Sequence, residues 1–212
     1  MAIVARRMSA PAIQSVGPPP ERHADRVVAE MTRWLQAEAE RHFPMIIAVL
    51  REPRPGNAKA QARHLARLRR AAGPMLLDAK LEPGTRGKYA VHVHILFFSD
   101  DTRQVVVDRT ILRGLGNHGS RNEWKRALLI SHHAMVRMAM RNGVRTIGDL
   151  HAALAAIGRG FVVHETELTG MPFPPAGRRF AFAGGVAVVR RDPRGGLVVA
   201  TVLESKEEEE GK

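Results

Sequence analysis

The sequence predicts an α+β protein whose antiparallel sheet carries helices packed on one face. Three observations predict this class: apolar residues at helical spacing near the start of the chain, β-forming runs separated by turn residues in its middle, and two helical segments followed by a β-meander at its end. With 212 residues, 44% hydrophobic and 25% charged, the composition is that of an ordinary globular protein. A disordered chain, a collagen and a coiled-coil rod are therefore excluded.

The first part of the chain predicts a leader followed by an N-terminal α+β region over 21–120. Residues 1–20 end in Gly-Pro-Pro-Pro and lack periodicity, which predicts a flexible leader. Helical spacing of apolar residues predicts a helix over 21–42, and the short apolar run 43–50 predicts a strand. The remaining elements are a helix over 58–72 with Asn57 as its N-cap, strands over 75–81, 89–98 and 104–111, and a connector over 115–121.

A second α+β unit is predicted over 127–203. Ser131 stands at the N-cap of a helix over 132–141, which Asn142-Gly143 ends. Thr146 begins another helix, and beyond Gly158 the residues turn to β-forming types. Strands are predicted over 161–166, 178–183, 186–191 and 197–203, and an acidic tail follows over 204–212.

The charge is basic and uneven. Lys and Arg number 33 against 21 Asp and Glu, which gives a net charge of +12, and the acidic tail leaves the rest of the chain more basic still. Only six of the 33 cations are lysine. A guanidinium presents a planar fork of donors that matches phosphate oxygens, so we expect nucleic acid as the partner and no membrane. Codon bias explains arginine over lysine but not the net excess.

Several functions lose their usual sequence support. The chain has no cysteine, which excludes disulfides, thiolate zinc sites and cysteine nucleophiles. It has no Walker loop, no Gly-x-Gly-x-x-Gly after a strand and no Gly-x-Ser-x-Gly elbow, and we expect no cofactor. It also lacks an apolar stretch of about 20 residues and the pattern of a secretory signal, which predicts a cytoplasmic protein.

The first candidate site is the helix over 132–141. His133, Arg137 and Arg141 recur at i, i+4 and i+8, so they lie on one helix face. A histidine in the first turn suits proton transfer to or from a ribose hydroxyl. The two arginines beside it would stabilise the negative charge that develops on the phosphate. The alternative is a solvated polar stripe opposite a Met and Ala core face.

The pattern Ser-x-His-Ala-x-x-Arg-x-x-x-Arg, followed by a short helix and a meander ending in Val-Val-x-Thr-Val, resembles the small ribonuclease toxins of the barnase–EndoU–colicin–RelE superfamily. The resemblance covers 127–203. It implies a metal-independent site that cleaves RNA through attack of the 2′-hydroxyl, so RNA is favoured over DNA. His133 would be the general base or acid, Arg137 or Arg141 would bind phosphate, and Thr201 would supply a hydroxyl. The preceding region would then bind substrate, neutralise the enzyme or bind a protein partner.

Five further arginines are candidates for nucleic-acid binding. Arg63, Arg67 and Arg70 lie on one side of the helix over 58–72 and suit a phosphate backbone, with a solvated helix face as the alternative. Arg178 and Arg179 begin a strand and either reach the same cleft as His133 or protect an edge strand from aggregation.

The last candidate is Val-His-Val-His-Ile, in which His92 and His94 fall on one face of a strand about 7 Å apart. That spacing suits a shared metal ion, and the same short pattern occurs in rolling-circle nucleases and relaxases. Those enzymes also need a tyrosine, and Tyr89 falls on the opposite face. Candidate further ligands are His118 and the Asp100-Asp101 pair, and the alternative is a polar sheet face.

Three functions follow from these sites. The leading hypothesis is a metal-independent ribonuclease. The alternatives are a non-enzymatic nucleic-acid-binding or accessory protein of phage or mobile-element type, and a metal-dependent nuclease that uses His92 and His94.

Overall fold

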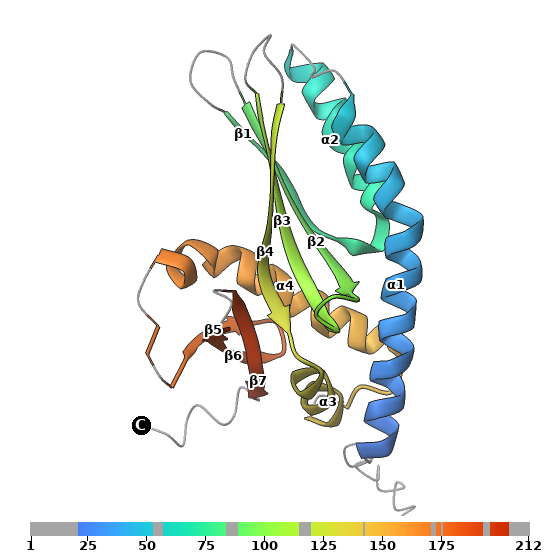
Figure 1. Cartoon of the computed structure of the whole chain (residues 1–212), viewed down its shortest axis with the longest axis vertical. Helices are drawn as coiled ribbons and strands as arrows, with labels where there is room; N and C mark the ends of the chain where they lie inside the picture. Colours follow the sequence, from blue (N-terminus) through green and yellow to red (C-terminus); the bar gives the residue numbers. More distant parts are fainter. Residues whose placement is uncertain are drawn as a thin grey trace, which may run out of the picture.

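The computed structural model describes residues 21–52, 57–83, 89–114, 120–141, 143–170, 173–174, 176–192 and 196–203. The predicted leader, the acidic tail and His118 lie outside these residues. Within the described part, the chain forms four α-helices and seven strands (Figure 1). In chain order these are α1 (Glu21–Arg51), α2 (Ala58–Ala72), the 3₁₀ turn Gly73–Met75, β1 (Leu76–Pro83), β2 (Tyr89–Ser99), β3 (Gln104–Gly114), β4 (Ser120–Ile130), α3 (His132–Arg141), α4 (Ile147–Gly170), β5 (Arg178–Phe182), β6 (Gly185–Arg191) and β7 (Leu197–Leu203).

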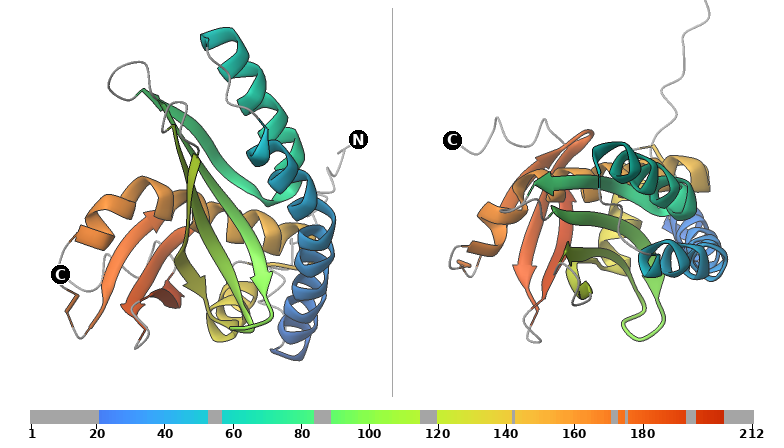
Figure 2. Two further views of the ribbon diagram at one scale, coloured as in Figure 1. Left: turned by 45° about the horizontal axis from the view of Figure 1, so that its top comes forward. Right: turned by 90° about the horizontal axis from the view of Figure 1, so that it is seen from above.

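The strands form one sheet in the order β1-β2-β3-β4-β7-β6-β5. Every neighbouring pair is antiparallel except β4 and β7, which are parallel and pair only at Leu129–Val198 and Ile130–Val199. The sheet therefore has two limbs, β1 to β4 and the meander β5 to β7, and α4 crosses behind both (Figure 2). The α+β class and the C-terminal order of two helices followed by a meander are confirmed.

Two apolar clusters hold these layers together. The larger one combines residues from α1, α3, α4 and both limbs of the sheet, from Ala24 to Val202. The smaller one joins α2 and the second half of α1 to β1 and β2. Alternate residues of β2 take part in different clusters, with Val93 and Ile95 in the smaller and Leu96 in the larger. Helices consequently lie on both faces of β2, whereas the sequence analysis places them on one.

The predicted helix starts are confirmed by their caps. Asn57 Oδ1 accepts a hydrogen bond from the amide of Ala60 at 2.9 Å, and Ser131 Oγ accepts one from the amide of Ala134 at 3.1 Å. Thr146 and Asp149 form a reciprocal capping box, in which each side chain accepts a hydrogen bond from the other residue's amide.

The strand predicted over 43–50 is wrong, because α1 continues to Arg51. Ala39, Ile46 and Leu50 are buried against α2 at helical intervals, and Phe43 packs beside them. Pro44 lacks an amide hydrogen and interrupts one helical hydrogen bond, but the apolar stripe runs on through it. The short apolar run is therefore the end of an amphipathic helix.

The strand predicted over 161–166 is also wrong, because α4 runs without a break from Ile147 to Gly170. Its two central glycines lie where the helix approaches neighbours closely. A Cβ on Gly158 would lie 2.5 Å from Leu77 Cδ1, and a Cβ on Gly160 would lie 2.8 Å from Phe182 Cβ and 2.9 Å from the Ala181 carbonyl oxygen. These glycines allow close packing rather than ending the helix.

We expect Gly160→Ala to lower the free energy of unfolding by about 1–3 kcal/mol, because the new methyl group would collide with the backbone of β5. The matched control is Gly148→Ala in the first turn of α4, whose Cβ would meet only the Thr146 hydroxyl at 3.6 Å. Alanine favours helix over glycine, so the control should be neutral or stabilise by up to about 1 kcal/mol. Urea unfolding measures both, and equal stabilities would contradict the packing role.

Candidate functional site

The two histidines of the Val-His-Val-His-Ile run share a face of β2, and charged residues from three other elements surround them. In the register of the sheet, His92 lies opposite Lys80 of β1 and His94 lies opposite Arg109 of β3. Glu165 reaches this face from α4. The sheet-face cluster, as we name it, consists of Lys80, Glu82, His92, His94, Arg109 and Glu165.

The inner half of the sheet-face cluster is buried between the sheet and α4. His94 Nε2 lies 3.3 Å from Glu165 Oε2, and Arg109 Nη1 donates to Glu165 Oε1 at 2.7 Å. The side chain of His94 is 3% exposed and that of Glu165 is 10% exposed. Burial raises the pKa of Glu165, but the hydrogen bond from His94 and the charge of Arg109 outweigh it and lower the pKa overall. Glu165 is therefore held as a carboxylate.

The outer half of the cluster is more accessible to solvent. Glu82 Oε2 lies 3.0 Å from His92 Nε2, and Glu82 Oε1 accepts from Lys80 Nζ at 2.9 Å. The hydrogen bond from Lys80 is the main cause of a lowered pKa at Glu82. Burial lowers the pKa of His92 below its ordinary value of 6.5, although the Glu82 carboxylate acts in the opposite direction. At neutral pH, His92 is thus an unprotonated imidazole that can donate from one ring nitrogen to Glu82 and accept a proton on the other.

The cluster keeps unused hydrogen-bonding capacity. His94 Nδ1 and Arg109 Nε are buried and have no partner among the described residues. A small cavity of about 70 Å³ adjoins Glu165, with Thr169 and Arg191 also in its wall. No three His, Asp or Glu side chains in the described ranges are arranged as ligands around one point. A histidine paired with a carboxylate suits proton transfer, and a guanidinium suits anion binding.

The candidate site on α3 is open surface. His133 and Arg137 are exposed on one helix face, as their spacing predicts. The guanidinium of Arg141 instead donates to the carbonyl oxygen of Val202 at 3.0 Å, which fastens α3 to β7. Thr201 is half-buried on that same strand. The structure brings α3 and β7 into contact, but none of these four residues lines the small cavity beside Glu165.

The five arginines predicted to bind nucleic acid lie in different surroundings. On α2, Arg63 and Arg70 are exposed, whereas Arg67 Nη1 donates to Glu52 Oε1 at 3.0 Å. On β5, Arg179 is exposed and the guanidinium of Arg178 lies 5.6 Å from the centre of the Phe173 ring. Arg191 of β6 lies 5.4 Å from the same ring, so two cations contact one aromatic side chain.

Sequence reasoning found His92 and His94 but missed Glu82, Arg109 and Glu165. The first two follow from hairpin register, since β1 pairs antiparallel with β2 and β2 with β3. No sequence pattern places Glu165 beside the histidines, because the strand predicted over 161–166 is in fact part of α4. Of the other ligand candidates, Asp100 and Asp101 lie in the turn after β2; Gln36 donates to Asp100 and Arg126 pairs with Asp101.

Comparison of the whole chain with protein-family models, with curated proteins and with solved structures found no match in any of the three. None of the helices in the described part is long and apolar enough to cross a membrane.

We expect Glu165→Gln to lower the free energy of unfolding at pH 7 by about 2–3 kcal/mol, because Arg109 would lose its buried carboxylate partner. The pKa of Glu165 is lowered in the folded state, so its carboxylate contributes stability above the ordinary pKa of 4.5, and this contribution is lost as pH falls through the lowered pKa. The gap between wild type and variant should therefore shrink in acid.

Urea unfolding at pH values from 7 down to 3 measures this gap. The matched control is Glu167→Gln, two residues further along α4, where the side chain is 60% exposed and its Oε2 lies 3.6 Å from His164 Nδ1. That change should shift stability little at any pH. A gap for Glu165→Gln that stays constant across the range would contradict the assignment of a buried, ionised Glu165.

Proposed function

We propose that this protein binds nucleic acid and cleaves RNA at the sheet-face cluster by metal-independent proton transfer. The observation that carries the proposal is His92, whose imidazole is held by Glu82 and kept unprotonated at neutral pH. Attack of a ribose 2′-hydroxyl on phosphorus needs a base of this kind, close to a cation that holds the phosphate. Arg109, 25% exposed, is that cation, and Glu165 positions it.

The roles within the sheet-face cluster divide between its two halves. His92 would accept the proton of the 2′-hydroxyl as the 2′-oxygen bonds to phosphorus. The bond from phosphorus to the 5′-oxygen would break, and the 5′-oxygen would take a proton from water, which leaves a 2′,3′-cyclic phosphate and a 5′-hydroxyl. Glu82 would fix the orientation of the imidazole ring. The exposed part of the Arg109 guanidinium would bind a phosphate oxygen while Nη1 donates to Glu165. His94 is buried and would act through Glu165 as a positioning residue.

The charge supports nucleic acid as the partner. The net charge of +12 attracts polyanions, and exposed arginines stand on several elements, among them Arg63 and Arg70 of α2, Arg137 of α3 and Arg179 of β5. These side chains are distributed rather than gathered at the cluster, which suits contact with the backbone of a long strand.

A metal-dependent nuclease at the same face is the second candidate. It is favoured by the pairing of each histidine with a carboxylate, His92 with Glu82 and His94 with Glu165, because imidazole nitrogen and carboxylate oxygen are donors that divalent cations accept. A bound cation would supply Lewis-acid activation of the phosphate.

We expect the full chain to cut single-stranded RNA in the presence of EDTA, and His92→Ala to slow cleavage by about 100-fold or more, the contribution of a general base. The assay uses end-labelled single-stranded RNA, structured RNA and duplex DNA. Matched controls are His164→Ala at a half-buried position of α4 and His133→Ala at an exposed position of α3, and both variants should keep full activity.

Each other outcome selects a different function. Cleavage lost only in His133→Ala would place the reaction on α3 with Arg137. Cleavage that requires Mg²⁺ or Mn²⁺ and disappears in EDTA would establish the metal-dependent nuclease. Retention of RNA or DNA without any cleavage would make this a binding protein, and neither binding nor cleavage would contradict the nucleic-acid proposal altogether.

A further inference from the structure

A groove lies where the first half of α1, the turn between β2 and β3 and the start of α3 come together (Figure 1). Its volume is about 540 Å³. We name it the α1–α3 groove, and seven residues that the structure describes line it: Ala29, Thr32 and Arg33 of α1, Phe98 of β2, Arg103 of the turn, and His132 and Met135 of α3. The three residues from α1 recur at i, i+3 and i+4, so they share one face of that helix.

Basic side chains line the rim of the α1–α3 groove. Arg33, Arg103 and His132 are exposed, and none of the seven residues is an aspartate or a glutamate. Neither arginine forms an ion pair within the part of the chain that the structure describes. His132 Nε2 lies 3.5 Å from Asp25 Oδ1, but both side chains are more than half exposed, so this pair contributes little and can yield to a ligand. Two unpaired cations at one groove favour an anionic occupant.

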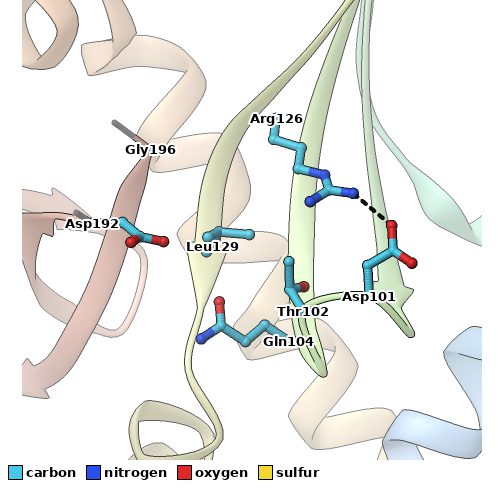
Figure 3. A pocket seen from close by; sticks show the side chains of 7 residues that line it. All are labelled: Asp101, Thr102, Gln104, Arg126, Leu129, Asp192 and Gly196. Carbon is cyan, nitrogen blue, oxygen red and sulfur yellow. Dashed lines mark hydrogen bonds and ion pairs between the residues drawn. The ribbon is translucent and has the colours of Figure 1, made fainter. Parts of the chain in front are cut away.

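The two carboxylates in the turn that carries Arg103 do not line the groove and have other partners. Asp100 accepts a hydrogen bond from the side chain of Gln36 at 3.3 Å. Asp101 points to Arg126 of β4, with 3.0 Å between Oδ2 and Nη2 (Figure 3). The guanidinium of Arg103 is therefore left for a ligand.

Arg103 occupies a backbone position that favours glycine. Its φ of 52° lies in the left-handed region, and no other non-glycine residue in the described ranges has a positive φ. Glycine, asparagine or aspartate would form such a turn with less strain. The turn itself thus gives no reason for an arginine here, and we attribute the choice of residue to its side chain, which lines the groove.

Phe98 adds an aromatic surface to the groove. Its side chain stands near the end of β2 and packs against the larger apolar cluster, but it is only half-buried, so part of the ring is open to the groove. Nucleobases stack on such a ring whatever their identity, because every base has a π face. The groove therefore combines a surface for a planar ring with cations for a phosphate.

We propose that the α1–α3 groove binds one nucleotide of a single-stranded nucleic acid, RNA under the proposed function, with the phosphate on Arg33 and Arg103 and the base on Phe98. The groove volume lies within the range of about 300–1,000 Å³ that single small ligands occupy. A duplex keeps its bases stacked inside, so a single strand alone can offer a base and a phosphate together. The inference rests on nucleic acid as the partner and not on cleavage, because no residue of the sheet-face cluster lines the groove.

The test measures binding of a labelled single-stranded 2′-O-methyl RNA to the full chain by fluorescence anisotropy. This RNA lacks the attacking hydroxyl, so it stays intact even if the protein cleaves natural RNA. The groove variant is Arg33→Gln with Arg103→Gly, and the charge-matched control is Arg51→Gln with Arg159→Gln, two exposed arginines that do not line the groove. Glycine suits the left-handed position of the turn, so the groove variant should melt near the wild-type temperature.

Both double variants lose two positive charges, so a general electrostatic effect would be equal in the two. The groove variant should bind about tenfold or more weakly than the control, because it loses charge-assisted hydrogen bonds to a phosphate. The slope of log Kd against log salt concentration should fall by about 0.7, the value for one phosphate of a single strand. The slope of the control should stay near that of wild type.

A second pair of variants tests the base. Phe98→Leu should weaken binding by about fivefold or more, because a stacked base is lost, and should bind an abasic oligonucleotide as well as wild type does. The matched control is Phe97→Leu, on the opposite face of β2, where the ring packs against Phe43 in the smaller cluster. It should bind both oligonucleotides like wild type.

Four results would overturn the inference. Equal affinities of the groove variant and its control would do so while nucleic acid remains the partner. An equal loss of affinity for the normal and the abasic oligonucleotide in Phe98→Leu would exclude base stacking. Tighter binding of poly-glutamate than of RNA, lost in the groove variant, would assign the groove to an acidic protein partner. No binding of RNA by wild type would overturn the proposed function together with the inference.

Discussion

The parallel contact between β4 and β7 is the joint on which the architecture depends. Two residue pairs connect two antiparallel limbs that would otherwise be separate sheets. The next residue along the chain reinforces the joint, because the hydroxyl of Ser131 donates to the Val199 carbonyl oxygen while capping α3. Arg141 then fastens the far end of α3 to β7. With α3 fixed in this way, α4 begins at a defined place and crosses the sheet to bring Glu165 to His94.

The crossing of α4 over the sheet carries a desolvation cost in the inner half of the sheet-face cluster. An imidazole, a carboxylate and a guanidinium lose water when α4 packs on β2 and β3, and well-packed apolar side chains of similar volume would stabilise such an interface at least as well. Under the proposed function, the arrangement meets a requirement of chemistry rather than of stability, because a buried carboxylate with a lowered pKa, such as Glu165, is typical of functional sites. His92 and Glu82, at the accessible end, are the groups that this requirement would serve.

Local patterns predicted most elements, and long-range pairing determined the rest. Helix starts are predictable at Asn57, Ser131 and Thr146, because a cap is a hydrogen bond between residues close together in the sequence. The strands predicted over 43–50 and 161–166 are wrong because a short apolar run has the same composition in a strand and in a buried helix. The histidine pair was visible in the sequence, but its partner Glu165 lies 71 residues beyond His94 and is supplied by tertiary packing alone.

Gly158 and Gly160 also limit how this sequence can diverge. Helix α4 contacts β1 beside Gly158 and β5 beside Gly160, so it packs against both limbs of the sheet. Residues on the surface can be exchanged without altering this packing, whereas a side chain at Gly158 would displace Leu77 of β1 and one at Gly160 would displace β5. A sequence that adopts this fold therefore needs the Gly-x-Gly spacing inside an apolar helix, whichever residues stand on the sheet face.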